Sequence, residues 1–419
     1  MARRLRDTVT ITSVSGGGFP IVIDRATTYE IVTDIMSPSV ARFELGDGGT
    51  WNAIGEALKI GGRFSVAVNG SPRVQGRLLT RNLAVTSSAG ATVQLVVRTR
   101  LADAAFTSVD PKVGVRNTTL HDVVLKAFAK MGLTEADFIF KANTARDLIT
   151  GAKSGSPNPA AGLRAQRAKV AATASSVERD VALSTLDDQI ASAESRPVDP
   201  ELSTLREDEA RPHPPETILA FVDRHLARFS LMIWDAPDGR IVIGKPDDSQ
   251  QPLYVMTCRR GAAAVTNNLL SATKSEDFEA VPAELWIFGF GGGRDQTKTK
   301  IRALRTDPLL HATVPSLDRT AVVIDETIRT PEQAEARARR EMMRRSMLKD
   351  CWTLETDGLS YWTGSTQIPY AIDTVGDVRV DVAGGASGAY LFHQVMMSGS
   401  ADQGHTTRLV GSGRGVWDL

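Results

Sequence analysis

GRFSVAVNGSPRVQGRLLTRNLAV, residues 62–85, and ATVQLVVRTR, residues 91–100, decide the fold class of this chain. Apolar side chains, many of them β-branched or aromatic, alternate with polar ones at every second position, which is the period of a half-buried strand. Glycine, asparagine, serine and proline separate such segments, as turns require. Short strands at this spacing predict a small antiparallel barrel or sandwich over residues 8–105. Three upstream segments repeat the pattern: TVTIT (8–12), FPIVID (19–24) and ARFELG (41–46).

The period changes from two to that of a helix at NTTLHDVVLKAFAKMGL, residues 117–133. Asn117 or Thr118 is suited to cap this helix, and Gly132 to end it. A second helical segment, PPETILAFVDRHLARFS, occupies residues 214–230.

LMIWDAPDGRIVIGKP, residues 231–246, follows as two strands joined by an Asp-Gly hairpin turn. Together with the two helical segments it predicts one small α/β domain, residues 106–149 and 214–248, interrupted by residues 150–213.

The insertion at 150–213 differs in composition from its surroundings. TGAKSGSPNPAAG is typical of a flexible linker, and the alanine-rich stretch after it predicts a helix with a thin apolar stripe. The favoured interpretation is a helix lying on the protein's own surface, and the alternative is a helix that binds a partner. Its acidic, proline-bounded end, RPVDPELSTLREDEARPHPP, is expected to be loose in the isolated chain.

Residues 249–419 return to strand patterns and contain one clear helix within RTPEQAEARARREMMRRSMLKD, 329–350. Thr330 is the expected N-cap, Pro331 fits the first helical position, and Gln333 is placed to close a capping box. The helix should show a narrow face of small residues and the i,i+4 ion pairs Glu335–Arg339 and Glu341–Arg345. That face comprises Ala334, Ala338, Met342 and Ser346.

Composition limits the function. The 419 residues suffice for two to three domains, and 49 basic residues balance 49 acidic ones, which argues against a dedicated nucleic-acid coat. The start, MARRLRDTVTI, lacks the apolar run of a secretory signal, and no stretch approaches the roughly 18 apolar residues of a membrane span. Cys258 and Cys351 are expected to be two buried thiols, with a disulfide between them as the less favoured alternative.

GFGGGRDQTKTK, residues 289–300, looks like a phosphate-binding loop because glycines precede basic side chains. The spacing matches neither GxxxxGK[ST] nor GxGxxG, and no helix start follows to bind an anion. We therefore interpret it as strand, glycine-rich turn and strand, in which the glycines allow a positive φ.

No other pattern indicates catalysis or cofactor binding. The six histidines are scattered without metal-ligand spacing, His225 and His393 are expected to be structural, and nothing distinguishes Glu44 and Asp47 from solvated loop charge. The arginines of RARREMMRR alternate with glutamates, which favours a solvated helix face over a nucleic-acid surface. The sequence therefore predicts no enzyme, and no catalytic, cofactor-binding or metal-binding residue.

The order of these segments resembles the central baseplate hub proteins of contractile-tailed, Mu-like bacteriophages. The resemblance rests on the succession as a whole and covers nearly all of the chain except the insertion. It is carried by ARFELGDGGTW (41–51), TLHDVVLKAFAKMGL (119–133), ETILAFVDRHLARFSLMIWDAPDGRIVIGKP (216–246), NNLLSATKSEDF (267–278) and YLFHQVMMSGSADQGHTTRLV (390–410).

The resemblance implies a mainly β, α+β fold with two similar antiparallel β-barrel domains, 1–105 and 249–419, and helix 331–348 packed on the second. Such proteins form homotrimers whose six barrels make a pseudo-sixfold ring. The ring joins the hexameric tail tube to the trimeric central spike in the virion baseplate, which is assembled in the host cytoplasm. The hub part of type VI secretion spikes is similar.

The insertion departs from the family pattern, and we expect it to become ordered on assembly, against a neighbouring subunit, a wedge protein or a sheath protein. Two other functions stay open. A tail-associated cell-wall hydrolase would need a larger inserted domain with converging carboxylates. A spike component of a contractile secretion system would be expected to continue into a long repetitive β-structure.

Overall fold

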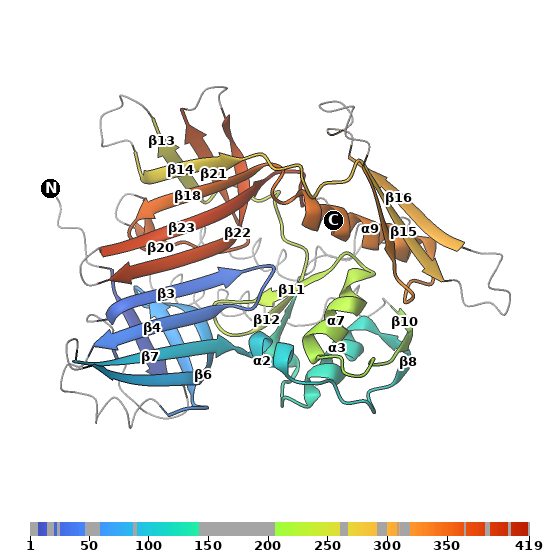
Figure 1. Ribbon diagram of the computed structural model, residues 1–419, viewed down its shortest axis with the longest axis horizontal. Helices are drawn as coiled ribbons and strands as arrows, with labels where there is room; N and C mark the ends of the chain where they lie inside the picture. Colours follow the sequence, from blue (N-terminus) through green and yellow to red (C-terminus); the bar gives the residue numbers. More distant parts are fainter. Residues whose placement is uncertain are drawn as a thin grey trace, which may run out of the picture.

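The computed structural model describes residues 7–14, 21–22, 26–46, 59–86, 90–141, 206–259, 267–290, 300–307, 310, 319–363, 366–381, 386–400 and 404–417. Over these ranges the chain is mainly β, and its helices lie between a large sheet at the left and a smaller group of strands at the right (Figure 1). Most strand pairs are antiparallel. The predicted mainly β, α+β fold with antiparallel sheets is confirmed.

One large sheet contains strands from both ends of the chain, because the C-terminal strand β22 pairs with the N-terminal strand β3. β21 (Thr374–Val380) branches from β22, and β13 (Tyr254–Cys258) pairs with β21. In order, the main path is β14 (Leu269–Ser275), β18 (Cys351–Asp357), β23 (Gly404–Gly413), β22 (Ala386–Ser400), β3 (Ala26–Asp34), β4 (Val40–Gly46), β7 (Gly90–Thr99), β6 (Ser71–Thr86), β5 (Arg63–Val68), β1 (Val9–Ser13) and β2 (Ile21–Val22).

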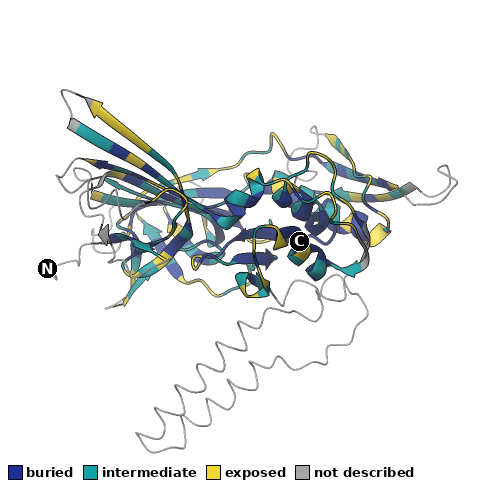
Figure 2. Cartoon of the chain, turned by 90° about the horizontal axis from the view of Figure 1, so that it is seen from below, coloured by how far each residue is buried: buried dark blue, intermediate teal, exposed yellow. Residues whose placement is uncertain are grey.

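The two halves of this sheet share one apolar core. Phe43 and Leu95 contribute to it from the N-terminal half, and Trp352 and Phe392 from the C-terminal half. Burial alternates along the strands as the sequence pattern predicts: in β5, every second side chain points into the core. Figure 2 shows this buried interior running through the middle of the molecule, with exposed residues on the strands that project from it.

A small α/β domain packs beside the N-terminal half. α3 (Leu120–Ala129) begins after Thr119, whose side chain accepts from the Asp122 N–H, so the expected caps Asn117 and Thr118 were one or two residues early. The predicted Asp-Gly hairpin is confirmed, with Gly239 at φ +83° between β11 and β12. The other elements are α2 (Arg100–Phe106), β8 (Val115–Thr119), β9 (Phe138–Phe140), α7 (Ile218–Ala227), β11 (Met232–Asp235) and β12 (Ile241–Gly244).

The end of the expected insertion belongs to this domain. β10 (Arg206–Ala210) pairs with β8, so the prediction that this segment is loose is wrong there. Strand pairing with β8 supplies the order that its acidic composition does not indicate. The rest of the insertion, 150–205, lies outside the described residues.

Residues 249–419 contain a second, separate sheet in addition to their strands in the large sheet. Its order is β16 (Lys300–Thr306), β15 (Glu284–Phe290) and β17 (Thr320–Ile324), and α9 (Pro331–Ser346) covers one face with its own apolar cluster. The predicted small-residue face of α9 is buried there, and Thr330 caps the helix by accepting from the Gln333 N–H. A two-stranded sheet, β19 (Ser360–Thr363) with β20 (Thr366–Pro369), completes the described elements.

Candidate functional site

The glycine-rich segment that resembles a phosphate loop joins two paired strands. β15 and β16 form an antiparallel pair with Phe290 opposite Lys300, which confirms strands on both sides of the turn; residues 291–299 lie outside the described part. Gly289 sits within β15, where an added Cβ would come 2.7 Å from Ile328 Cγ2 and 2.9 Å from the Ile328 carbonyl oxygen. Gly289 is thus required by close packing and not, as expected for these glycines, by a positive φ.

The described histidines and cysteines form no reactive cluster. No group of three or more His, Cys, Asp or Glu side chains among the residues described is placed to hold a metal ion. His225 packs edge-on against Phe221, with ring centroids 4.7 Å apart, and burial lowers the pKa of His393 to about 4. Both cysteines are free: Cys351 is buried, which raises its thiol pKa to about 11, whereas Cys258 is only partly buried.

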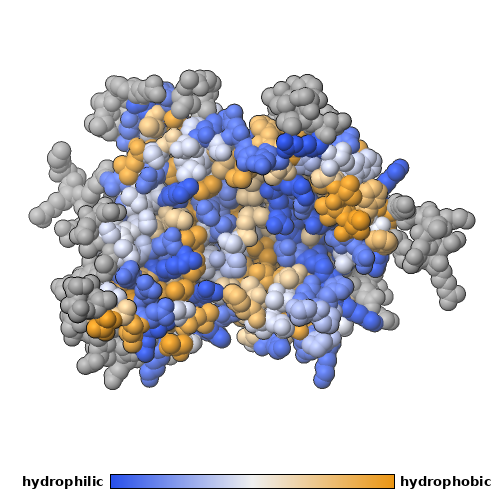
Figure 3. Space-filling view, in the orientation of Figure 1, coloured by the Kyte–Doolittle hydropathy of each residue, from blue (hydrophilic) through white to orange (hydrophobic). Residues whose placement is uncertain are grey.

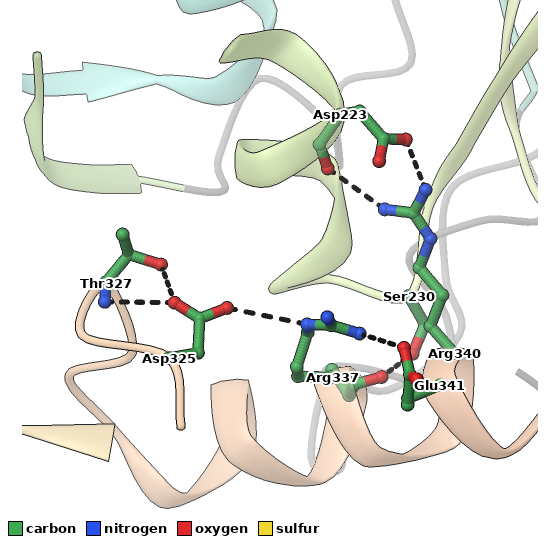
Figure 4. A network of polar contacts seen from close by, with 8 residues as sticks. Asp223, Ser230, Asp325, Thr327, Arg337, Arg340 and Glu341 are labelled. Atoms are coloured by element: carbon green, nitrogen blue, oxygen red, sulfur yellow. Dashed lines mark hydrogen bonds and ion pairs between the residues drawn. The ribbon is translucent and has the colours of Figure 1, made fainter. Parts of the chain in front are cut away.

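The basic run on α9 is not simply a solvated face, because Arg340 is buried with 5% of its surface exposed. Its Nη1 donates to the Asp223 carbonyl oxygen at 2.9 Å, and its Nη2 pairs with the Asp223 carboxylate (Figure 4). Burial lowers the pKa of Arg340, and the charge of Asp223 opposes that shift. A buried guanidinium needs such a partner, so this pair ties α9 to α7.

The same network links α9 to the loop after β17. Arg337 Nε lies 3.4 Å from Asp325 Oδ2, and Arg337 Nη1 donates to Glu341 at 3.0 Å (Figure 4). Ser230 Oγ donates to the Ala336 carbonyl oxygen at 2.5 Å. The predicted pairs on this helix, Glu335–Arg339 and Glu341–Arg345, are confirmed. These contacts are all internal, so they position the β16–β15–β17 sheet against α7.

Asp235 is the described carboxylate that most resembles a catalytic one. It is buried in β11, and burial raises its pKa to about 6. Perturbed carboxyls of this kind often mark active sites. Here, however, Asp235 Oδ2 accepts from the Ser39 N–H and from Thr99 Oγ, each at 2.8 Å. It joins the α/β domain to the N-terminal half of the large sheet.

The outer face of the β16–β15–β17 sheet carries exposed apolar side chains. Trp286 lies between Leu304 and Val322, and Phe288 lies between Arg302 and Ile324 in the next row. The rings of Trp286 and Phe288 stack with centroids 6.1 Å apart. In Figure 3 a hydrophobic patch lies over β15 and β16 at the right of the molecule. A sheet face of this kind is typical of an interaction surface.

The two ends of the eight-strand run from β14 to β6 are also exposed. On β14, Ser271, Thr273 and Ser275 are exposed on one face, and Ala272 and Lys274 on the other face are partly buried. At the far end of β6, Leu83 and Val85 are 66% and 80% exposed. Exposed strand edges pair readily with strands of another chain. Sequence patterns predicted these strands but carried no signal of which would lie at an edge.

Comparison with known proteins shows that this chain has the fold of phage tail proteins. No family model and no curated protein matches the sequence. The crystal structure of a tail protein from Neisseria meningitidis MC58 matches with a TM-score of 0.69 and 15% identity, over 99% of this chain and 98% of that one. The 43 kDa tail protein of prophage MuSo2 from Shewanella oneidensis matches with 0.66 and 15%, over 98% and 100%.

A secretion protein shares the fold more distantly. Escherichia coli c3393, a component of the type VI secretion system described as similar to the T4 tail proteins gp27 and gp5, matches with a TM-score of 0.51 and 10% identity. The match covers 98% of this chain and 78% of that one. No described helix is long and apolar enough to cross a membrane.

Proposed function

We propose that this chain is a structural protein of a contractile phage tail, the hub of the virion baseplate. In this proposal it forms a homotrimer that binds the hexameric tail tube on one side and the trimeric central spike on the other. The observation that carries it is the pairing of the two halves of the large sheet through β22 and β3 in a chain that has the fold of tail proteins. Three such chains would present six barrel units to a sixfold tube.

A role in binding rather than catalysis agrees with what the polar side chains do. Two buried groups whose pKa values are shifted, Asp235 and Arg340, bond internally and hold domains together. The exposed features are strand edges and an apolar sheet face, which suit protein partners. Wedge or sheath proteins are further partners in this proposal, through residues 150–213, and the balanced charge supports no specific nucleic-acid binding.

Purified particles test the proposal. We expect the chain to co-purify with contractile tails at three copies per tail, counted by quantitative mass spectrometry, and to lie between tube and spike in electron microscopy reconstructions. A copy number of six, or a position along the tube, would contradict the hub assignment.

The similarity to the type VI secretion protein favours one second candidate, a spike component of a secretion apparatus. The same particles separate the two. Tails attached to DNA-filled heads support the phage hub, and tube assemblies without heads support the secretion spike.

A further inference from the structure

The two halves of the large sheet repeat one strand connectivity. In the N-terminal half the order is β6, β7, β4 and β3; in the C-terminal half it is β22, β23, β18 and β14. All pairings along this run are antiparallel. The first part of β6 pairs with β5, as the first part of β22 pairs with β21. Each strand therefore has a counterpart: β6 corresponds to β22, and β3 to β14.

Irregularities in strand pairing, where the register shifts by one residue, occur at equivalent places in the counterparts and allow a residue-by-residue alignment. β6 shifts between Leu78 and Thr80, and β22 shifts between Phe392 and Gln394, in each case where the strand leaves its first neighbour. The other pair of counterparts, β3 and β14, also shifts against its neighbour near its start. These shifts fall between Ala26 and Thr28 and between Leu269 and Ser271.

An independent hydrogen bond supports this alignment. Counting from the shifts, Asp277 corresponds to Asp34. Asp34 Oδ1 accepts from the Met36 N–H at 2.7 Å, and Asp277 Oδ1 accepts from the Glu279 N–H at 2.8 Å. The same turn thus ends both strands.

The alignment makes two junctions equivalent, β22 with β3 and β6 with β14, and only the first forms within the chain. β22 pairs through Gln394–Ser400 with Thr28–Asp34 of β3. The corresponding edges are 80–86 of β6 and 271–277, which run from β14 into the two residues after it, and neither edge pairs with another strand among the described elements. We infer that β6 of one copy pairs with β14 of the next copy, which rests on the trimer of the proposed function. The strand directions continue to alternate across this junction, so the sheet closes into a ring.

The alignment sets the register of the proposed β6–β14 pair, and in this register side chains of opposite charge face each other. Gln394 lies opposite Asp34 and donates to it at 3.0 Å; by equivalence Thr80 lies opposite Asp277. One residue further, Arg81 faces Glu276, so opposite charges meet across the strands. Further along the same face, the exposed Leu83 and Val85 become covered by the neighbour's β14.

Engineered disulfides test this register. The bond from the Ile35 N–H to the His393 carbonyl fixes which β3–β22 pairs exchange hydrogen bonds. By equivalence Ala84 and Thr273 form a non-hydrogen-bonded pair, with Cα atoms about 4.5 Å apart, close enough for a disulfide. The experiment uses the full chain carrying Ala84→Cys and Thr273→Cys, with Cys258→Ala to remove the partly buried thiol. Mild oxidation should then give covalent dimers and trimers on a non-reducing gel.

The control is Ala84→Cys with Ser275→Cys, which lies on the same face but two residues out of register. We expect at least a tenfold lower yield of linked chains from it. Both positions of the first pair are exposed, so an unchanged melting temperature should show that the fold is intact. A trimer by mass that forms no link at Ala84 and Thr273, or links both pairs equally, overturns the strand pairing and leaves the hub proposal standing. A monomer overturns both.

Discussion

At the scale of single residues, Asp235 and Arg340 show how this chain uses buried charge. Asp235 satisfies a backbone N–H and a hydroxyl of the neighbouring sheet half, and Arg340 bonds both the carbonyl and the carboxylate of Asp223. Buried ionic groups of this kind contribute little net stability but penalise any arrangement that separates them. They therefore orient the domains relative to one another.

The raised pKa of Asp235 predicts a pH dependence of stability. A carboxyl whose pKa rises from 3.8 to about 6 on folding binds its proton more tightly in the folded state, so the free energy of unfolding falls as pH rises from 4 to 6. The fall amounts to about 3 kcal/mol at most. His393, with its pKa lowered to about 4, acts in the opposite direction over an overlapping range.

The variant Asp235→Asn isolates the carboxyl, since His393 is unchanged in it. We expect its melting temperature, relative to the natural chain, to improve as pH rises from 4 to 6.5, because the asparagine never ionises. A difference in melting temperature that is constant over this range would show that Asp235 does not titrate there.

A charge exchange tests the contact between copies. Arg81→Glu places two like charges across the proposed β6–β14 junction and should weaken self-association roughly fivefold per interface. Arg81→Glu combined with Glu276→Arg should restore it. The apparent dissociation constant from sedimentation gives the comparison, and a double variant as weak as the single one would contradict the pairing.

At the scale of elements, local patterns predicted much of the structure. The alternation over 62–100, the N-cap Thr330 of α9 and Pro331 at its start lie where the sequence placed them, because each depends on neighbours within a few residues. The expected capping box does not form, because the Gln333 side chain accepts from the Arg329 N–H instead. The burial of Arg340 was not predictable, since its partner Asp223 lies 117 positions away in the chain. β3 was also missed, although it joins the two halves of the large sheet. Its partner β22 follows more than 350 residues later, and no local signal shows that contact.

Proline substitutions distinguish the edge of β14 that pairs with β18 from its open edge. The Asp277 N–H donates to the Leu348 carbonyl on the β18 side, and N–H groups alternate along a strand. Those of Thr273 and Ser275 therefore point to β18, and that of Ala272 points to the open edge. Because proline has no N–H, Ala272→Pro should keep the fold and abolish self-association, whereas Thr273→Pro should destabilise the fold.

Circular dichroism melting and sedimentation of both variants give the result. Thr273→Pro is the matched control, as it lies one residue away on the same exposed strand. If Ala272→Pro still associates like the natural chain, the open edge of β14 is not the interface.

At the scale of the whole molecule, two repeated sheet halves and two edges that stay unpaired among the described strands are what the proposed ring requires. Within one chain the halves meet through β22 and β3, and the outer edges face away from that junction. When an edge of one copy pairs with a different edge of the next, the copies form a closed ring if the rotation between neighbours is a whole fraction of a full turn. The apolar outer face of the β16–β15–β17 sheet takes no part in this proposed closure and stays available to another protein.

The mass of the natural chain in solution tests the ring most directly. Sedimentation equilibrium or mass photometry at micromolar concentration should give about 135 kDa, three times the 45.1 kDa of the chain. A mass of 45.1 kDa across that concentration range would contradict the account, because the edges of β6 and β14 would then stay unpaired.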